Sequence, residues 1–171
     1  MRGQIYRKLA VTNLKNNRKT YVRYILTAVL TVMMFYMMDA LSRTEGLGTE
    51  TMEVVLAYGR GVIVVFAVIF LFYTNSFLIK RRKREIGVYH ILGMGKRHIA
   101  KMLLTETLIT AVAGIGGGLL LGIAFGKLLY LAFLKLLQAH TSLKFEVSVP
   151  AVTDAVLLFL AIFLLTLCYN L

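Results

Sequence analysis

Residues 80–101 have the sequence KRRKREIGVYHILGMGKRHIAK, a basic segment between two apolar runs that are each about long enough to cross a membrane. Eight of these residues are Lys or Arg, and Glu85 is the only acidic one. Positive charge between two membrane spans holds the connecting segment on the cytoplasmic side. The segment therefore predicts a helical hairpin in the membrane with its turn inside the cell.

The composition of the whole chain is that of a multi-pass membrane protein. Of its 171 residues 58% are hydrophobic, the net charge is +12, and the charges fall between apolar runs. A basic excess is typical of proteins that bind nucleic acid or anionic lipid, and the apolar runs favour the anionic lipid of the inner leaflet over nucleic acid. The single Cys168 lies in an apolar run, so neither a disulfide nor a metal cluster is expected.

The hydropathy pattern predicts an all-α integral membrane fold with four transmembrane helices, at about residues 24–41, 61–79, 102–126 and 151–169. Residues 1–23 form a separate cytoplasmic region, in which the amphipathic pattern of 4–19 predicts a helix lying on the membrane surface. Residues 24–171 form the transmembrane region. A short outer loop is expected over 42–60, an extended segment over 143–149, and a helix start at Pro150.

The distribution of basic residues predicts the orientation. Fifteen of the twenty Lys and Arg residues lie before the first span or in 80–101, which places the N-terminus and the central segment in the cytoplasm. The last residues of the chain follow the fourth apolar run with no basic flank. A chain cut inside or just after a span has this pattern, so we expect these residues to be part of a longer membrane protein.

Three polar residues lie within or beside the predicted spans. Asp39 lies near the outer end of the first span, where we expect its carboxylate to reach water. Asn75 lies near the inner end of the second span, where we expect it to be wetted or to cap the helix. Glu106 lies just inside the third span and has two interpretations: a buried, titrating carboxylate, or an interfacial one near Arg97 or Lys101.

Glycines recur every four residues in the third span. They are Gly114, Gly118, Gly122 and Gly126. Glycines at this spacing line one face of a helix and allow another helix to approach closely. The pattern predicts a helix-packing face, and the alternative is a surface on which two helices slide or hinge.

The sequence lacks the motifs of an enzyme. Residues 93–96, GMGK, partly resemble a phosphate-binding loop, but that motif needs Gly where His90 stands and Ser or Thr where Arg97 stands. The three histidines have no metal-ligand spacing. We therefore expect no catalytic residue, metal or cofactor in this chain.

The central segment has an apolar helical pattern of its own. Ile86, Tyr89 and Gly93 follow at i, i+3 and i+7, and Glu85 stands where a carboxylate favours a helix N-terminus. Gly93 and Gly95 should end this helix, and a new one should begin at Lys96. The pattern predicts a short helix across the cytoplasmic side, which either acts as a lever on both spans or only seats the hairpin on lipid.

Within this segment KREIGV at 83–88, LGM at 92–94 and KRHI at 96–99 resemble the signature of FtsX-like ABC transporter permeases. FYTNSFLIKRR at 72–82 and the short first outer loop are similar to the permease subunits of bacitracin-type antimicrobial-peptide transporters of Firmicutes. The resemblance covers nearly the whole chain. Members of that family continue into further spans and a large extracellular domain, which this sequence does not contain.

The resemblance implies a multi-pass permease of the bacterial cytoplasmic membrane that works in antibiotic resistance. In such systems a coupling helix, here Glu85–His98, docks on a separate ATP-binding subunit, expected as a homodimer, and many members signal to a membrane histidine kinase. The residues to which the resemblance assigns ATPase coupling are Glu85, Ile86, Gly87, Tyr89, Leu92, Gly93, Met94, Lys96, Arg97 and His98. The alternatives are a membrane adaptor for a histidine kinase and an FtsX-type cell-division regulator, although the short outer loop argues against the latter.

Overall fold

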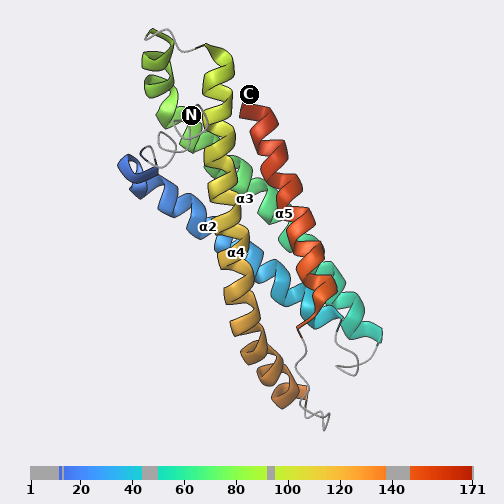
Figure 1. Ribbon diagram of the computed structural model, residues 1–171. Coiled ribbons are helices and arrows are strands. Elements are labelled where there is room, and N and C mark those ends of the chain that lie inside the picture. Colours follow the sequence, from blue (N-terminus) through green and yellow to red (C-terminus); the bar gives the residue numbers. More distant parts are fainter. Residues whose placement is uncertain (1–11, 13, 44–49, 92–94, 138–146, 171) are drawn as a thin grey trace.

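Four long helices make up almost all of the computed structural model, which describes residues 12, 14–43, 50–91, 95–137 and 147–170. In chain order they are α2 (Arg18–Ser42), α3 (Glu50–Ile91), α4 (Lys96–Leu137) and α5 (Val149–Asn170). Successive helices run in opposite directions along the bundle (Figure 1). Each contains an apolar stretch long enough to cross a membrane, where a helix satisfies its own backbone hydrogen bonds. The predicted all-α fold with four apolar spans is confirmed.

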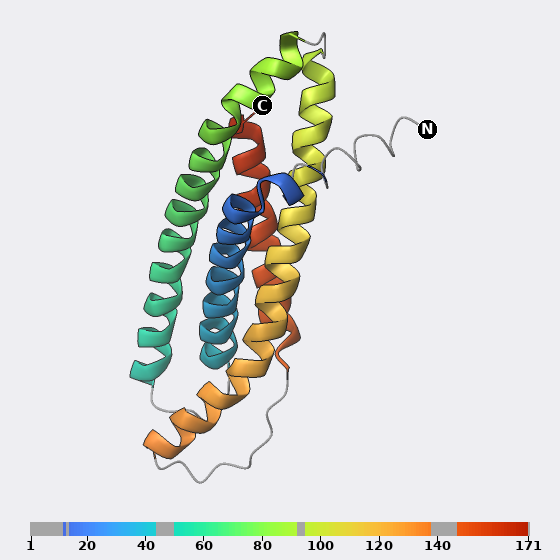
Figure 2. The same cartoon turned by 90° about the vertical axis from the view of Figure 1, so that its left-hand side faces the viewer.

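The first helix of the bundle, α2, is its centre. It packs most extensively against α4 and next against α3, whereas α3 and α4 barely touch each other. Figure 2 shows α2 and α5 between the outlying α3 and α4. Aromatic side chains join α2 to α5: Tyr24 meets Phe163 edge to face at 6.1 Å between ring centroids, and Phe35 meets Phe159 at 5.9 Å.

Two helices extend well beyond the apolar windows that predicted them. Both α3 and α4 have 42 residues, so each is about 63 Å long, roughly twice the thickness of the hydrocarbon core. The prediction of a loop through residue 60 is wrong, because α3 already begins at Glu50. Hydropathy detects the part of a helix that lies in lipid, and charged turns continue the same helix into water.

The segment at residues 80–101 also differs from its prediction. Glu85–Ile91 are not a separate short helix but the last turns of α3, with no interruption after the apolar span. Figure 2 shows this end of α3 leaning toward the start of α4. A new helix does begin at Lys96, as predicted: the backbone oxygen of Gly95 accepts hydrogen bonds from the amides of His98 (2.9 Å) and Ile99 (3.4 Å).

The predictions for the two remaining segments are tested only in part. Most of the predicted surface helix over 4–19 lies outside the described residues; within it, Leu14 packs against the core and Lys15 is exposed. The predicted extended segment lies outside the described residues over 143–146, and Val149 belongs to α5 instead. The expected helix start at Pro150 is confirmed within one residue, and Ser148 Oγ accepts a hydrogen bond from the Ala151 amide at 3.4 Å.

Candidate functional site

The end of α3 and the start of α4 form a projection at one end of the bundle, here called the inner projection (residues 81–91 and 95–101). Val88 and Ile91 lie three residues apart on α3, and Ile91 is 86% exposed. Arg97 and His98 are exposed at the start of α4. Apolar side chains next to basic ones, all uncovered by the described chain, suit contact with another protein.

The structure describes only part of the predicted coupling set. Gly87 lies on α3 with open space where a side chain would stand, and Arg97 and His98 are exposed. Of the remaining members, Leu92, Gly93 and Met94 lie outside the described residues. The structure places the backbone of Glu85, Ile86, Tyr89 and Lys96 on α3 and α4 but does not describe their side chains.

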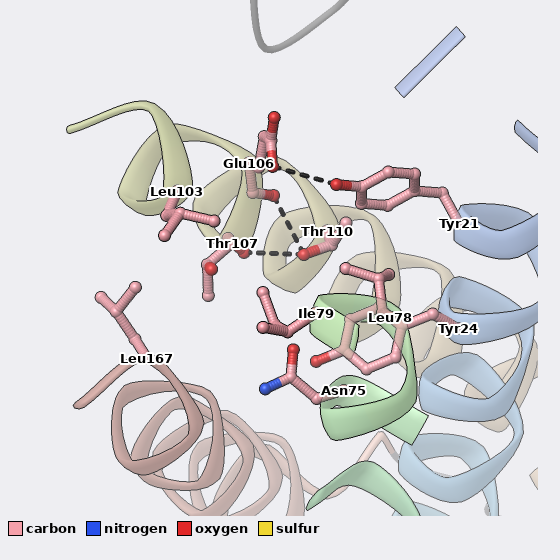
Figure 3. Close-up of a pocket in the computed structure, with 10 residues that line it drawn as sticks. All are labelled: Tyr21, Tyr24, Asn75, Leu78, Ile79, Leu103, Glu106, Thr107, Thr110 and Leu167. Carbon is pink, nitrogen blue, oxygen red and sulfur yellow. Dashed lines mark hydrogen bonds between the residues drawn. The ribbon is translucent and has the colours of Figure 1, made fainter. Parts of the chain in front are cut away.

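A buried polar cluster lies beneath the inner projection, where α2, α3, α4 and α5 meet (Figure 3). Glu106 on α4 is only 3% exposed, and the Tyr21 hydroxyl on α2 donates a hydrogen bond to its Oε2 at 2.9 Å. Of the two interpretations of Glu106, its burial agrees with the first, and the titrating role stays a prediction. Arg97 and Lys101, the expected neighbours, are exposed. A carboxylate buried at membrane depth is costly, and such groups are usually functional.

A small cavity lies within this cluster. Its volume is about 20 Å³. Leucine and isoleucine side chains line it together with polar side chains from α2, α3 and α4. The polar members are Tyr21, Tyr24, Asn75, Glu106, Thr107 and Thr110. Asn75 does not cap a helix, because α3 continues to Ile91, and its side chain is 8% exposed at the edge of this cavity.

The predicted glycine face of α4 lies against α2. A Cβ atom added to Gly114 would be 2.9 Å from Ala28 Cβ, and one added to Gly118 would be 2.5 Å from Val32 Cβ. A Cβ added to Gly122 would be 2.8 Å from the Tyr36 ring. The fourth glycine, Gly126, is also buried. The contacts advance by one turn on both helices, which is the pattern of two parallel helices in close contact.

A charged cluster joins three helices at the opposite end of the bundle. The Asp39 side chain is completely buried, and it accepts hydrogen bonds from Arg43 Nε at 2.9 Å and Arg60 Nη1 at 2.5 Å. Arg43 also pairs with Asp154 on α5. The expectation that Asp39 reaches water is therefore wrong, since two arginines compensate its charge. The hydrogen bond to Asp39 raises the pKa of Arg43 and keeps it charged.

Several of these contacts could not be found by sequence analysis. Tyr21, Arg60 and Asp154 carry no local signal, because each meets its partner from another helix. Their position near the end of an apolar run is the one available hint. Among the described residues there is no group of three or more His, Cys, Asp and Glu that could hold a metal ion.

Comparison with known proteins agrees with the fold and with the motif at residues 83–99. A family model described as FtsX-like permease C-terminal matches residues 61–171. Bacitracin export permease protein BceB of Halalkalibacterium halodurans is 30% identical over 170 residues, covering 95% of this chain and 26% of that protein. BceB of Bacillus subtilis is 25% identical over 167 residues, with the same two coverages.

An uncharacterized ABC transporter permease of Bacillus subtilis, YvcS, is 26% identical over 163 residues, 92% of this chain and 25% of that protein. The chain thus spans about a quarter of the length of the curated relatives that it matches.

Proposed function

The chain belongs to the FtsX-like permease family, and on that basis we propose that it forms part of the membrane-spanning subunit of an ABC transporter for bacitracin-type antimicrobial peptides. In this proposal the transporter serves resistance to such peptides and their sensing. ATP hydrolysis takes place on a separate ATP-binding subunit that works as a homodimer. The names of two relatives, both bacitracin export permeases, support the class of ligand.

The inner projection is the observation that carries the proposal. The apolar part of α3 ends at Lys80, so its last turns extend about 16 Å beyond it. α4 starts at the same end of the bundle and enters the apolar zone within its first turns. A subunit that pushes on this projection would act directly on two transmembrane helices. This supports the assignment of ATPase coupling to residues 85–98, with the end of α3 as the lever.

The charges at this end support its placement in the cytoplasm. Exposed basic side chains surround the inner projection: Arg18, Lys19, Arg23, Lys80, Arg97 and Lys101. Basic residues at the end of a span favour the cytoplasmic side and attract anionic lipid headgroups. We therefore place the start of α2 and the inner projection in the cytoplasm, with contacts to inner-leaflet anionic lipid.

Co-purification with the ATP-binding subunit tests the docking assignment. In the Arg97→Glu/His98→Glu variant, we expect the subunit to be lost from the purified permease while membrane insertion is unchanged, because both side chains are exposed. Lys127→Glu is the matched control, since Lys127 is exposed on α4 far from the inner projection. Retention of the ATP-binding subunit by the double variant would show that docking occurs elsewhere.

Docking of a membrane histidine kinase is a second candidate function. The observation in its favour is an apolar hollow of about 360 Å³ on the exposed face of α3, lined by Tyr58, Gly61, Val62 and Phe66 among others. A photo-reactive residue at Val62 should then crosslink to the kinase in membranes. Crosslinking to lipid alone would remove this candidate.

A further inference from the structure

The glycine face of α4 has one more position than α2 occupies. Three residues of α2, one in each successive turn, lie against its first three glycines: Ala28 against Gly114, Val32 against Gly118 and Tyr36 against Gly122. Gly126 follows at the same spacing, one turn further from the inner projection, and is buried too. The three α2 residues would therefore meet glycine again if α4 were shifted by one turn.

The Tyr36 side chain gives an independent reason to consider such a shift. It is completely buried, and its hydroxyl has no hydrogen-bond partner among the described residues. Its ring lies on Gly122, within a stretch of α4 (residues 111–126) that has no polar side chain. A hydroxyl buried without a hydrogen bond is costly. A shift of α4 toward the inner projection would bring its next polar residues, Lys127 and Tyr130, one turn closer to Tyr36.

The charged cluster at the opposite end of the bundle joins the other three helices. Asp39 of α2 pairs with Arg60 of α3, and Arg43, which follows α2, pairs with Asp154 of α5. The cluster formed by these pairs contains no residue of α4. Aromatic contacts also hold α5 to α2. The helices α2, α3 and α5 can therefore stay together while α4 moves along α2.

We propose that the contact between α2 and α4 has a second register, in which α4 is shifted by one helical turn toward the inner projection. In that register the last three glycines take the places of the first three: Gly118 lies against Ala28, Gly122 against Val32 and Gly126 against Tyr36. The shift of four residues is about 6 Å along the helix axis. Close packing is kept in both registers because glycine stands at each contact, and one-turn shifts of this kind are a known form of switching between packed helices.

The side chains beside the glycines decide the direction of the shift. A shift away from the inner projection would put Thr110 against Ala28, where even a Cβ added to the present glycine is only 2.9 Å away. A shift toward the inner projection puts Leu121 where Gly117 now lies. The nearest atom there is Val29 Cγ2, at 3.1 Å from an added Cβ, and the end of this side chain can rotate away.

The polar cluster beneath the inner projection fits the same shift. The Tyr21 hydroxyl now donates to Glu106 at 2.9 Å, and in the second register Thr110 takes the place of Glu106 and offers its hydroxyl oxygen. Glu106 then lies beside Asn17, the N-cap of α2, where a carboxylate is favourable. The first turn of α2 has no acidic residue, and Asn17 forms no side-chain capping hydrogen bond. This second register does not rest on the proposed docking of an ATP-binding subunit.

Spin-label distances in the full chain, reconstituted in lipid bilayers, test the second register. One pair of labels is at Met34 and Leu104 and the other at Val22 and Leu128, all exposed, in a Cys168→Ser background. The glycine contacts place the members of the first pair about 24 Å apart along the helix axis and those of the second about 30 Å apart in the opposite sense. The shift lengthens the first separation and shortens the second by about 6 Å along the axis. Helices that only move apart lengthen both.

Gly114→Ala should favour the second register. In the present register its Cβ would be 2.9 Å from Ala28 Cβ, whereas after the shift residue 114 lies where the larger Thr110 side chain is now buried. We expect a second population in this variant, with a longer first distance and a shorter second one. Gly118→Ala is the matched control, because its Cβ meets Val32 in one register and Ala28 in the other, so it should not produce this population.

The opposite signs of the two distance changes decide the outcome. The same changes in Gly114→Ala and Gly118→Ala, or two distances that change in the same sense in Gly114→Ala, would overturn the proposal. Circular dichroism checks that each variant keeps its helix content. If Gly114→Ala does not, Tyr21→Phe decides, because it removes the hydrogen bond to Glu106 that belongs to the present register. It should raise the same second population, and unchanged distances in that variant would overturn the proposal.

Discussion

The contact of Gly118 with α2 allows a quantitative test of the bundle. An added methyl group at Gly118 would be 2.5 Å from Val32 Cβ, 2.7 Å from Val32 Cγ1 and 2.9 Å from the backbone oxygen of Val29. A side-chain end can rotate away, but Cβ and a backbone oxygen move only with their helix. Gly118→Ala therefore has to push α2 and α4 apart.

The expected magnitude follows from two opposing terms. Inserting a methylene into a packed interface costs about 1–3 kcal/mol, and replacing Gly with Ala inside a helix returns about 1 kcal/mol. Gly116→Ala should show only the gain in helix propensity, because a Cβ at Gly116 meets nothing within 4 Å. The free energy of unfolding should therefore be lower in Gly118→Ala than in Gly116→Ala by about 1–3 kcal/mol.

Reversible unfolding in mixed detergent micelles, followed by circular dichroism, measures this difference. Both variants should keep the helix content of the unmodified chain, since the substitutions favour the helix locally. A Gly118→Ala variant at least as stable as Gly116→Ala would refute the close parallel packing of α2 and α4. It would also remove the structural basis of the glycine face.

Three further predictions use the same assay. Tyr36→Phe should leave stability unchanged or raise it by up to about 1–3 kcal/mol, because the buried Tyr36 hydroxyl has no hydrogen-bond partner; a loss of stability would reveal one. Asp39→Asn should cost about 3 kcal/mol, the lower end for a buried ion pair, because its two arginines are 35% and 38% exposed; no loss would contradict the charged cluster. Tyr21→Phe should cost about 1.5–3 kcal/mol by removing a hydrogen bond to buried Glu106, whereas Tyr73→Phe on the exposed face should cost nothing.

Hydropathy was sufficient to predict the four helices because lipid leaves the backbone few alternatives. A chain segment in hydrocarbon must satisfy its own hydrogen bonds, so a long apolar run becomes a helix. The same signal fails where the helix leaves lipid. Glu50 and Ile91 lie in polar surroundings, yet α3 continues through both, and only helix propensity could have indicated this.

The glycine spacing predicted a face but not what would lie against it. The face was visible in the period of four residues, since that is a property of one helix. In the structure the glycine face lies against Ala28, Val32 and Tyr36, because α2 packs beside α4. These two helices are not consecutive in the chain. Partner choice is a tertiary property, and no local pattern in the sequence of one helix encodes it.

The buried charges show the same limit more clearly. From the sequence, Asp39 is expected to reach water, because a carboxylate near the end of a span usually does. Its burial depends on Arg60, which arrives on the next helix, and on the link from Arg43 to Asp154 on α5. The sequence leaves two interpretations of the Glu106 environment. The residue that hydrogen-bonds to the Glu106 carboxylate in the structure, Tyr21, lies 85 residues away in the chain.

Photo-crosslinking from the inner projection tests the central claim most directly. A photo-reactive residue at Ile91, 86% exposed, should crosslink to the ATP-binding subunit in membranes, and the yield should change when ATP is added. The same residue at Tyr58, 74% exposed near the opposite end of α3, should give no such product. Equal crosslinking from both positions, or none from Ile91, would contradict the proposal that force from the ATPase enters this protein through the end of α3.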